Sequence, residues 1–174
     1  MRGIRPSRAE TGKRPGTESR RFWIVLAVMA AAEFVKGALF VSILPIHSAR
    51  TPGMSASVFG WALALQFIGD NALRIPAGKS IDRFGYKAPL VLGLAAAAAG
   101  VAALAWGGGA ASLLAGCFLL GAGTSPLWPC AASGAAAQGQ SGGAAFSGVY
   151  IASFAGTGAG PVAMGWLAKD DALR

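Results

Sequence analysis

Five apolar stretches, each of roughly twenty residues, constrain this chain more than any other feature of its sequence. A helix of about 20 residues is long enough to cross the ~30 Å hydrocarbon core of a bilayer. Hydrophobic residues make up 54% of the chain and charged residues 13%, against about a quarter charged in ordinary soluble domains. The sequence therefore predicts an all-α, polytopic membrane protein with five transmembrane helices. The predicted spans are about 22–46, 57–77, 88–106, 110–132 and 144–168.

The distribution of basic residues predicts the orientation. Seven of the fifteen Lys and Arg residues precede Phe22, and three more lie between the second and third stretches. An excess of Lys and Arg marks the cytoplasmic side of membrane proteins. The N-terminus is therefore expected in the cytoplasm, and the chain in the plasma (inner) membrane as a multi-pass protein. We expect residues 1–21 to form a basic disordered tail, 22–168 a helical bundle and 169–174 a C-terminal tail outside.

The net charge of +8 also suits a nucleic-acid-binding arm. The basic residues stand directly before an apolar stretch, however, which favours a membrane flank. We therefore expect the lipid bilayer, and no nucleic acid, as a partner.

Residues that could perform enzymatic or metal chemistry are scarce. The chain has two cysteines, Cys117 and Cys130, and one histidine, His47. These are too few for a disulfide framework or a Cys/His zinc site. The histidine lies three spans away from the serine that could serve as a nucleophile, Ser133, so no Ser–His pair is expected. The sequence thus predicts no enzyme, no cofactor and no metal.

Four ionisable residues lie inside the first two predicted spans: Glu33, Lys36, Asp70 and Arg74. Each costs about 2.5–3.5 kcal/mol near the centre of a membrane helix. The spacings of three and four residues place each pair on one helical face. One interpretation is ion pairing within each helix, with Arg74 reaching to the membrane surface. The other is a substrate or ion pathway in which the carboxylates exchange protons and the cations serve as counter-ions.

The segment between the second and third stretches carries a short signature. It reads Gly78-Lys79-Ser80-Ile81-Asp82-Arg83-Phe84-Gly85-Tyr86-Lys87. This resembles the cytoplasmic signature Gly-x-x-x-Asp-Arg-x-Gly-x-Lys of the major facilitator superfamily, in the same place between helices two and three. The resemblance implies a gating loop formed by Gly78, Asp82, Arg83, Gly85 and Lys87. In such a loop the glycines permit a tight turn, and Asp82 can cap or complement a helix N-terminus.

The fifth stretch carries a second resemblance to this superfamily. Gly148, Gly156, Gly160, Pro161 and Gly165 fit the glycine-and-proline pattern found on helix five of many antiporters of the family. Small residues at such spacing let helices pack closely, and a proline bends one of them. Plain Gly/Ala-rich helix packing is the alternative explanation. Helix four of proton-coupled members often carries an arginine before a Gly-x-Gly, and Cys117 stands where it would fall.

The resemblance spans about residues 22–168 and implies the N-terminal half of a transporter that moves a small solute by alternating access. The family is built from two six-helix halves with the substrate site between them. Five spans therefore predict an apparently truncated chain. Proton coupling stays an open alternative. A second alternative is a non-transporting membrane fragment or interaction subunit, and either function implies a partner C-terminal half or self-association.

Overall fold

The computed structural model describes residues 15–50, 54–137 and 142–171, and within these ranges the regular elements are helices, with no strand. The first predicted span forms one continuous helical rod. It consists of α1 (Pro15–Gly37), a π-helical segment η1 (Ala38–Ile43) and α2 (Leu44–Arg50). Residues 15–21, expected in the tail, already belong to α1. Residues 1–14 of the predicted tail lie outside the described residues, as do 172–174.

The second predicted span divides into α3 (Ala56–Ala72) and α4 (Arg74–Phe84). Ser55 caps the start of α3, where its side chain accepts a hydrogen bond from the Val58 N–H. The break at Leu73 follows from Pro76, which has no N–H to donate back to α3. The helical pattern resumes where the Ala77 N–H donates to the Leu73 carbonyl at 2.9 Å.

The expectation of a loop conformation over residues 78–87 was largely wrong, because α4 continues through Phe84 and α5 (Lys87–Trp106) begins at Lys87. The turn is confined to Gly85 and Tyr86. Gly85 has φ 76° and ψ 166°, a region that is essentially restricted to glycine. This glycine therefore ends α4 sharply and starts the next helix in a new direction.

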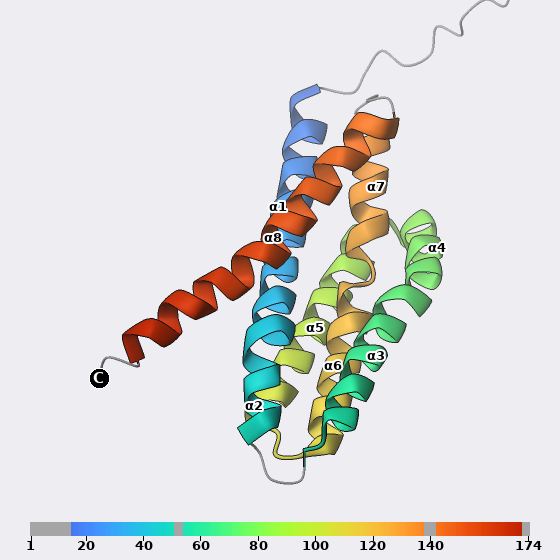
Figure 1. The fold of residues 1–174 in the computed structure, drawn as a ribbon. Coiled ribbons are helices and arrows are strands. Elements are labelled where there is room, and N and C mark those ends of the chain that lie inside the picture. The colour runs from blue at the N-terminus through green and yellow to red at the C-terminus, as the bar shows by residue number, and fades with distance from the viewer. Residues whose placement is uncertain (1–14, 51–53, 138–141, 172–174) are drawn as a thin grey trace, which may run out of the picture.

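The fourth predicted span is also divided, into α6 (Ala110–Thr124) and α7 (Leu127–Ala137), and the fifth lies within α8 (Gly142–Asp171). Pro126 and Pro129 explain the break between α6 and α7, because neither supplies a backbone donor. Pro161 lies inside α8 without interrupting it. In Figure 1 the successive segments run up and down the bundle, and α8 crosses α1 before its C-terminal part leans away from the other helices.

Glycines set the closest helix contacts. Gly93 and Gly100 of α5 meet Gly123 and Gly116 of α6, so that a Cβ on any of the four would collide with the facing helix. Both helices space their glycines seven residues apart, which gives one continuous antiparallel seam. The α3–α6 contact is built in the same way from Gly69 and Gly121. Small residues that let backbones approach are typical of membrane helix interfaces.

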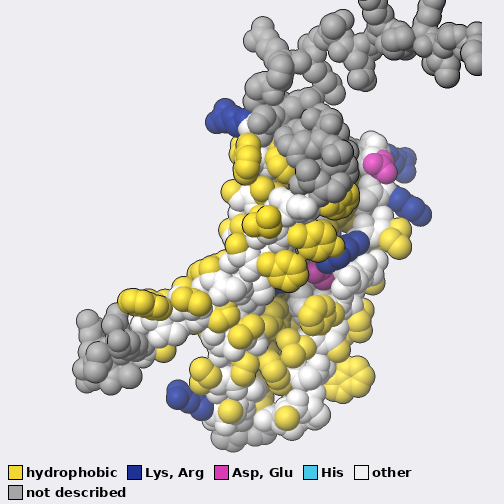
Figure 2. Space-filling view, turned by 45° about the horizontal axis from the view of Figure 1, so that its top comes forward, with side chains coloured by type: hydrophobic (Ala, Val, Ile, Leu, Met, Phe, Trp, Pro, Cys, Tyr) yellow, Lys and Arg dark blue, Asp and Glu magenta, His cyan; other side chains and the backbone are white. Residues whose placement is uncertain are grey.

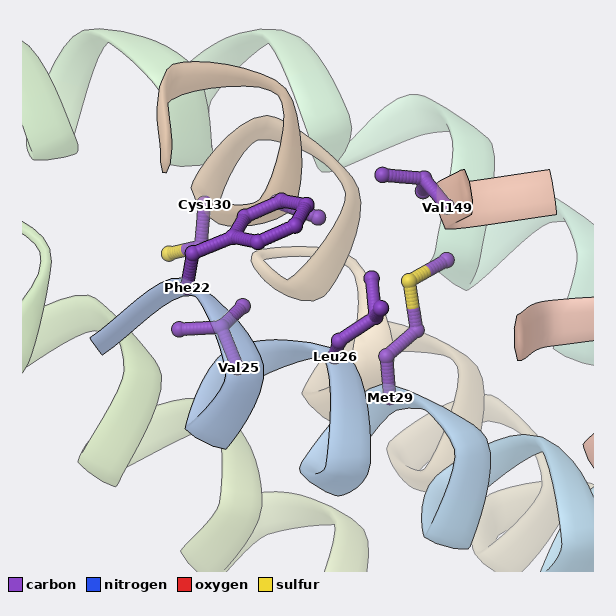
Figure 3. Close-up of a cluster of buried hydrophobic side chains, with 7 residues drawn as sticks. Phe22, Val25, Leu26, Met29, Cys130 and Val149 are labelled. Carbon is purple, nitrogen blue, oxygen red and sulfur yellow. The ribbon is translucent and has the colours of Figure 1, made fainter. Parts of the chain in front are cut away.

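Apolar side chains fill two buried clusters at different levels of the bundle. Figure 3 shows the first, where α1 side chains lie against Cys130 of α7 and Val149 of α8. Its members from α1 are Phe22, Val25, Leu26 and Met29. The second cluster joins Leu44 of α2 and Ala62 of α3 to Leu113 and Cys117 of α6.

Three of the described helical segments are long and apolar enough to cross a membrane: Phe22–Arg50, Lys87–Trp106 and Ala110–Gly134. The second and fifth predicted spans are helical but are not among these three, so the count of five spans stays a prediction. Large apolar side chains are exposed along the outside of the bundle, including Trp23, Trp61, Trp106 and Trp166. This exterior suits lipid.

Candidate functional site

The four charged residues expected inside the first two spans lie together. Lys36 Nζ is 2.6 Å from Glu33 Oε1 and 3.5 Å from Asp70 Oδ2. Arg74 Nη2 contacts the same Asp70 Oδ2 at 3.2 Å. The pairs are therefore not separate within each helix, because the Lys36–Asp70 contact links α1 to α3 and, through Arg74, to α4.

Three of the four charged residues in this cluster are buried. The relative exposure of Glu33 and Lys36 is 8% each, and that of Asp70 is 4%. Burial of an unpaired charge costs several kcal/mol, so the stability of this arrangement requires mutual pairing. Each carboxylate contacts a cation, and the formal charges of the four groups cancel.

A fourth helix, α8, contributes a polar group that the sequence did not single out. Thr157 of α8 donates from Oγ1 toward Glu33 Oε2 at 3.1 Å, and the Ser153 carbonyl of its own helix lies at the same distance. The hydroxyl has one proton, and a bond to a carboxylate is the stronger of the two. The cluster is thus held between α1, α3, α4 and α8.

Arg74 turns back toward Asp70 instead of reaching toward the Gly78 end of its segment. Its Nε and Nη2 donate to the two carboxylate oxygens at 3.4 and 3.2 Å. Its guanidinium carbon lies 5.2 Å from the centre of the Trp128 ring on α7, within cation–π range. In Figure 2 most Lys and Arg side chains of the visible face lie near its ends, and one cation–carboxylate pair lies between them among hydrophobic side chains.

The signature segment occupies the exposed end of α4 and the turn that follows it. Asp82 and Arg83 are exposed, and the Arg83 guanidinium lies over the Phe84 ring at 5.2 Å. The expected cap was wrong: Asp82 lies inside the last turn of α4, and the N-cap of α5 is Tyr86, without a side-chain bond. Gly78 lies beside Pro129 of α7, which places the middle of α4 against the fourth predicted span.

The glycines of the fifth span divide into two groups. A Cβ on Gly156 or Gly160 would collide with the α1 carbonyls of Ala30 or Phe34. In contrast, a Cβ on Gly148 or Gly165 would meet nothing within 4 Å in the part of the chain that the structure describes. Pro161 directly follows the close contact at Gly160.

Residues 22–171 match the family model described as Major Facilitator Superfamily. The chain belongs to this superfamily. No curated protein and no solved structure matches the chain significantly. The match covers all five predicted spans and confirms the family expected from the signature segment. Membership makes this a membrane protein with a transporter-type function, and the all-helical fold agrees with it.

Cys117 of this Major Facilitator Superfamily protein, which was expected to stand where proton-coupled members often carry an arginine, lies on α6. The thiol is fully buried among apolar residues of α2, α3 and α6. The cations of the cluster are supplied by α1 and α4.

Several residues beside the cluster escaped the sequence reasoning. They are Tyr150, Phe154 and Thr157 of α8, together with Trp128 of α7. A helical projection gives a usable signal for the α8 residues, because Val149, Ser153, Gly156 and Gly160 share one face with Thr157. A polar group on the face that carries the packing glycines is a candidate partner for a buried charge.

Proposed function

We propose that this chain moves a small solute across the plasma membrane by alternating access, with its N-terminus in the cytoplasm. The observation that carries the proposal is the Lys36–Asp70 ion pair, which connects buried charges of two separate helices. Charged groups inside membrane segments generally face a bundle interior or a water-filled cavity and mark the route of a substrate or ion. Glu33, Lys36, Asp70 and Arg74 would line that route.

The proposal assigns the gating role to the segment that links α4 to α5. Gly85 gives this link a sharp turn, and the exposed cations Arg83 and Lys87 suit anionic lipid headgroups on the cytoplasmic side. Motion of α4 would move Arg74, which begins that helix, relative to Asp70, which lies in the last turn of α3. The gating segment and the charge cluster are therefore mechanically connected through one short helix.

Cysteine labelling tests the pathway without knowledge of the solute. Cys117 and Cys130 are replaced by alanine, and single cysteines are introduced at Lys36, Asp70 and Leu92. We expect a membrane-impermeant maleimide to label positions 36 and 70 through water. Position 92 should stay unlabelled, because that α5 side chain is exposed on the outside of the bundle, where we expect lipid. Equal labelling at all three positions, or at position 92 alone, would reject the pathway.

The same background tests the orientation. A cysteine at Lys79 should react only from the cytoplasmic side, and one at Arg50 only from the outside. The reverse pattern would place the N-terminus outside and overturn the assignment.

Flux in proteoliposomes tests transport itself. Uptake of radiolabelled sugars, amino acids, organic anions and organic cations is measured for the wild type, Glu33→Gln, Asp70→Asn and the matched surface variant Lys79→Gln. We expect uptake of one class that Lys79→Gln keeps and the two carboxylate variants lose. An uncoupler that collapses the proton gradient should abolish uptake if protons are coupled to transport. No uptake, alone or with a candidate C-terminal half, would reject a working carrier.

The second candidate is a membrane interaction subunit that docks a partner half or another copy of the chain. The observation that favours it is the exposed apolar face of α8, which includes Ile151, Val162 and Trp166. Cross-linking in the membrane distinguishes the two. Uptake by the monomeric chain supports a carrier, whereas uptake only upon co-reconstitution with a partner supports the subunit.

A further inference from the structure

The guanidinium of Arg74 is the exposed member of the charge cluster. Asp70 holds one edge of the group, and Trp128 covers one face at 5.2 Å. The Arg74 side chain nevertheless keeps 34% of its surface exposed, compared with 6% for the Asp70 side chain. A guanidinium has five N–H donors in a fixed plane. The bonds to Asp70 use two of its nitrogens, and the exposed part can receive another planar group.

A row of aromatic rings continues from this guanidinium. Trp128 meets Tyr150 edge to face, with 5.1 Å between ring centroids, and Tyr150 stacks on Phe154 at 6.2 Å and 19°. Tyr150 and Phe154 are four residues apart on α8 and therefore share one face. They are 49% and 70% exposed. The row thus presents aromatic surface next to a partly exposed cation.

The charges around this row select the sign of a ligand. Asp70 is buried and is shared between Lys36 and Arg74, and Glu33 is held by Lys36 and Thr157. A cation approaching the aromatic row would meet the guanidinium before either carboxylate. The accessible charge is therefore positive, although the cluster as a whole is neutral.

We propose that Arg74, Trp128, Tyr150 and Phe154 form a binding subsite for a planar organic anion, specifically an aromatic carboxylate. The carboxylate would pair with the exposed edge of the guanidinium, and the ring would stack on Tyr150 and Phe154. The subsite rests on the proposed transport function and names the substrate class of that same pathway.

Binding to the full chain in lipid nanodiscs tests the subsite with naphthalene-2-carboxylate as the probe. We expect saturable binding that Arg74→Gln weakens at least about tenfold, because a hydrogen bond to a charged group is lost. Arg74→Lys should restore binding only in part, because lysine cannot form the bidentate pair. Phe154→Ala should weaken binding severalfold, and because this side chain is exposed the variant should fold normally. Lys79→Gln, which removes the same charge from the exposed side of α4, should bind as the wild type does.

Competition experiments test whether the subsite prefers an anion or a cation. Benzoate should displace the probe, and naphthalen-2-ylmethylamine should not. The absence of saturable binding, displacement by the amine, or equal weakening in Arg74→Gln and Lys79→Gln would each overturn the subsite. Circular dichroism of every variant separates loss of binding from loss of folding.

Binding and uptake together distinguish a failure of the subsite proposal from a failure of the transport proposal. If the probe does not bind while uptake of another solute is lost in Asp70→Asn, the substrate class is wrong and transport stands. If the probe binds in an Arg74-dependent way but no solute is taken up, the subsite stands and the carrier proposal fails.

Discussion

Lys36 Nζ lies within ion-pair distance of both Glu33 Oε1 and Asp70 Oδ2, at 2.6 and 3.5 Å, so one ammonium serves two buried carboxylates. Lys36, Glu33 and Asp70 therefore differ in how strongly the pairing within the cluster depends on each of them. Asp70 keeps Arg74 as a second partner, and Glu33 keeps the Thr157 hydroxyl. Loss of either carboxylate leaves a paired lysine, whereas loss of the lysine leaves Glu33 without a cation.

We expect Lys36→Met to lower the free energy of unfolding by about 3–5 kcal/mol, the usual cost of removing one partner from a buried ion pair. Unfolding of the purified protein in detergent measures it. Lys79→Met is the matched control, because that lysine is exposed on α4 and should change stability by less than about 0.5 kcal/mol. The double variant Glu33→Gln with Lys36→Met should recover part of the loss. Equal stability of Lys36→Met and Lys79→Met would contradict the buried ion pairing of Lys36.

Thr157→Val should lower stability by about 1.5–3 kcal/mol, because it removes a hydrogen bond to a buried carboxylate without changing side-chain volume much. The comparison is Thr124→Val. Thr124 is buried whereas Thr157 is half-buried, and the Thr124 hydroxyl donates to the Gly121 carbonyl of its own helix. A smaller effect at position 157 than at position 124 would show that the Glu33 contact contributes nothing.

Sequence periodicity and composition predicted the all-helical membrane fold, and the signature segment predicted the family. The helix breaks were harder to place. The sequence shows Pro126, but the apolar stretch of residues 110–132 continues on both sides of it. A single span was therefore expected where the structure has α6 and α7. The charged end of α4 was expected to be a loop, because a polar segment between two apolar stretches usually is one. The spacing of its polar and apolar residues also allows a helix.

The composition of the charge cluster could be read from the sequence, and its connections could not. Spacing placed Glu33 with Lys36 and Asp70 with Arg74, because helical neighbours follow from the chain itself. The Lys36–Asp70 contact depends on how α1 and α3 pack, which local spacing does not encode. The same holds for Trp128, whose position over Arg74 depends on the break before α7.

The glycines facing α1 should be intolerant of any side chain. Gly156→Ala would drive a Cβ into the Ala30 carbonyl, and we expect a loss of about 1–3 kcal/mol from overpacking at the α1–α8 contact. Gly158→Ala is the control. A Cβ there meets nothing within 4 Å in the described parts of the chain, so that variant should gain up to about 1 kcal/mol from better helix propensity. Equal stabilities in thermal unfolding would refute the contact.

The two glycines of the signature segment should respond in opposite directions to alanine. Gly85 adopts φ 76° and ψ 166°, where a Cβ costs on the order of 1–3 kcal/mol, so Gly85→Ala should lower stability and misdirect α5. Gly78 lies within α4, and its added Cβ would be 4.0 Å from Pro129 Cβ, an ordinary contact. Gly78→Ala should therefore be neutral or stabilise by up to about 1 kcal/mol. Stability and uptake are measured for both variants. If gating requires the sharp turn at Gly85, only Gly85→Ala should lose both stability and uptake. If Gly78→Ala is the more damaging change, the segment is instead limited by the approach of α4 to α7, and the gating role of the Gly85 turn is wrong.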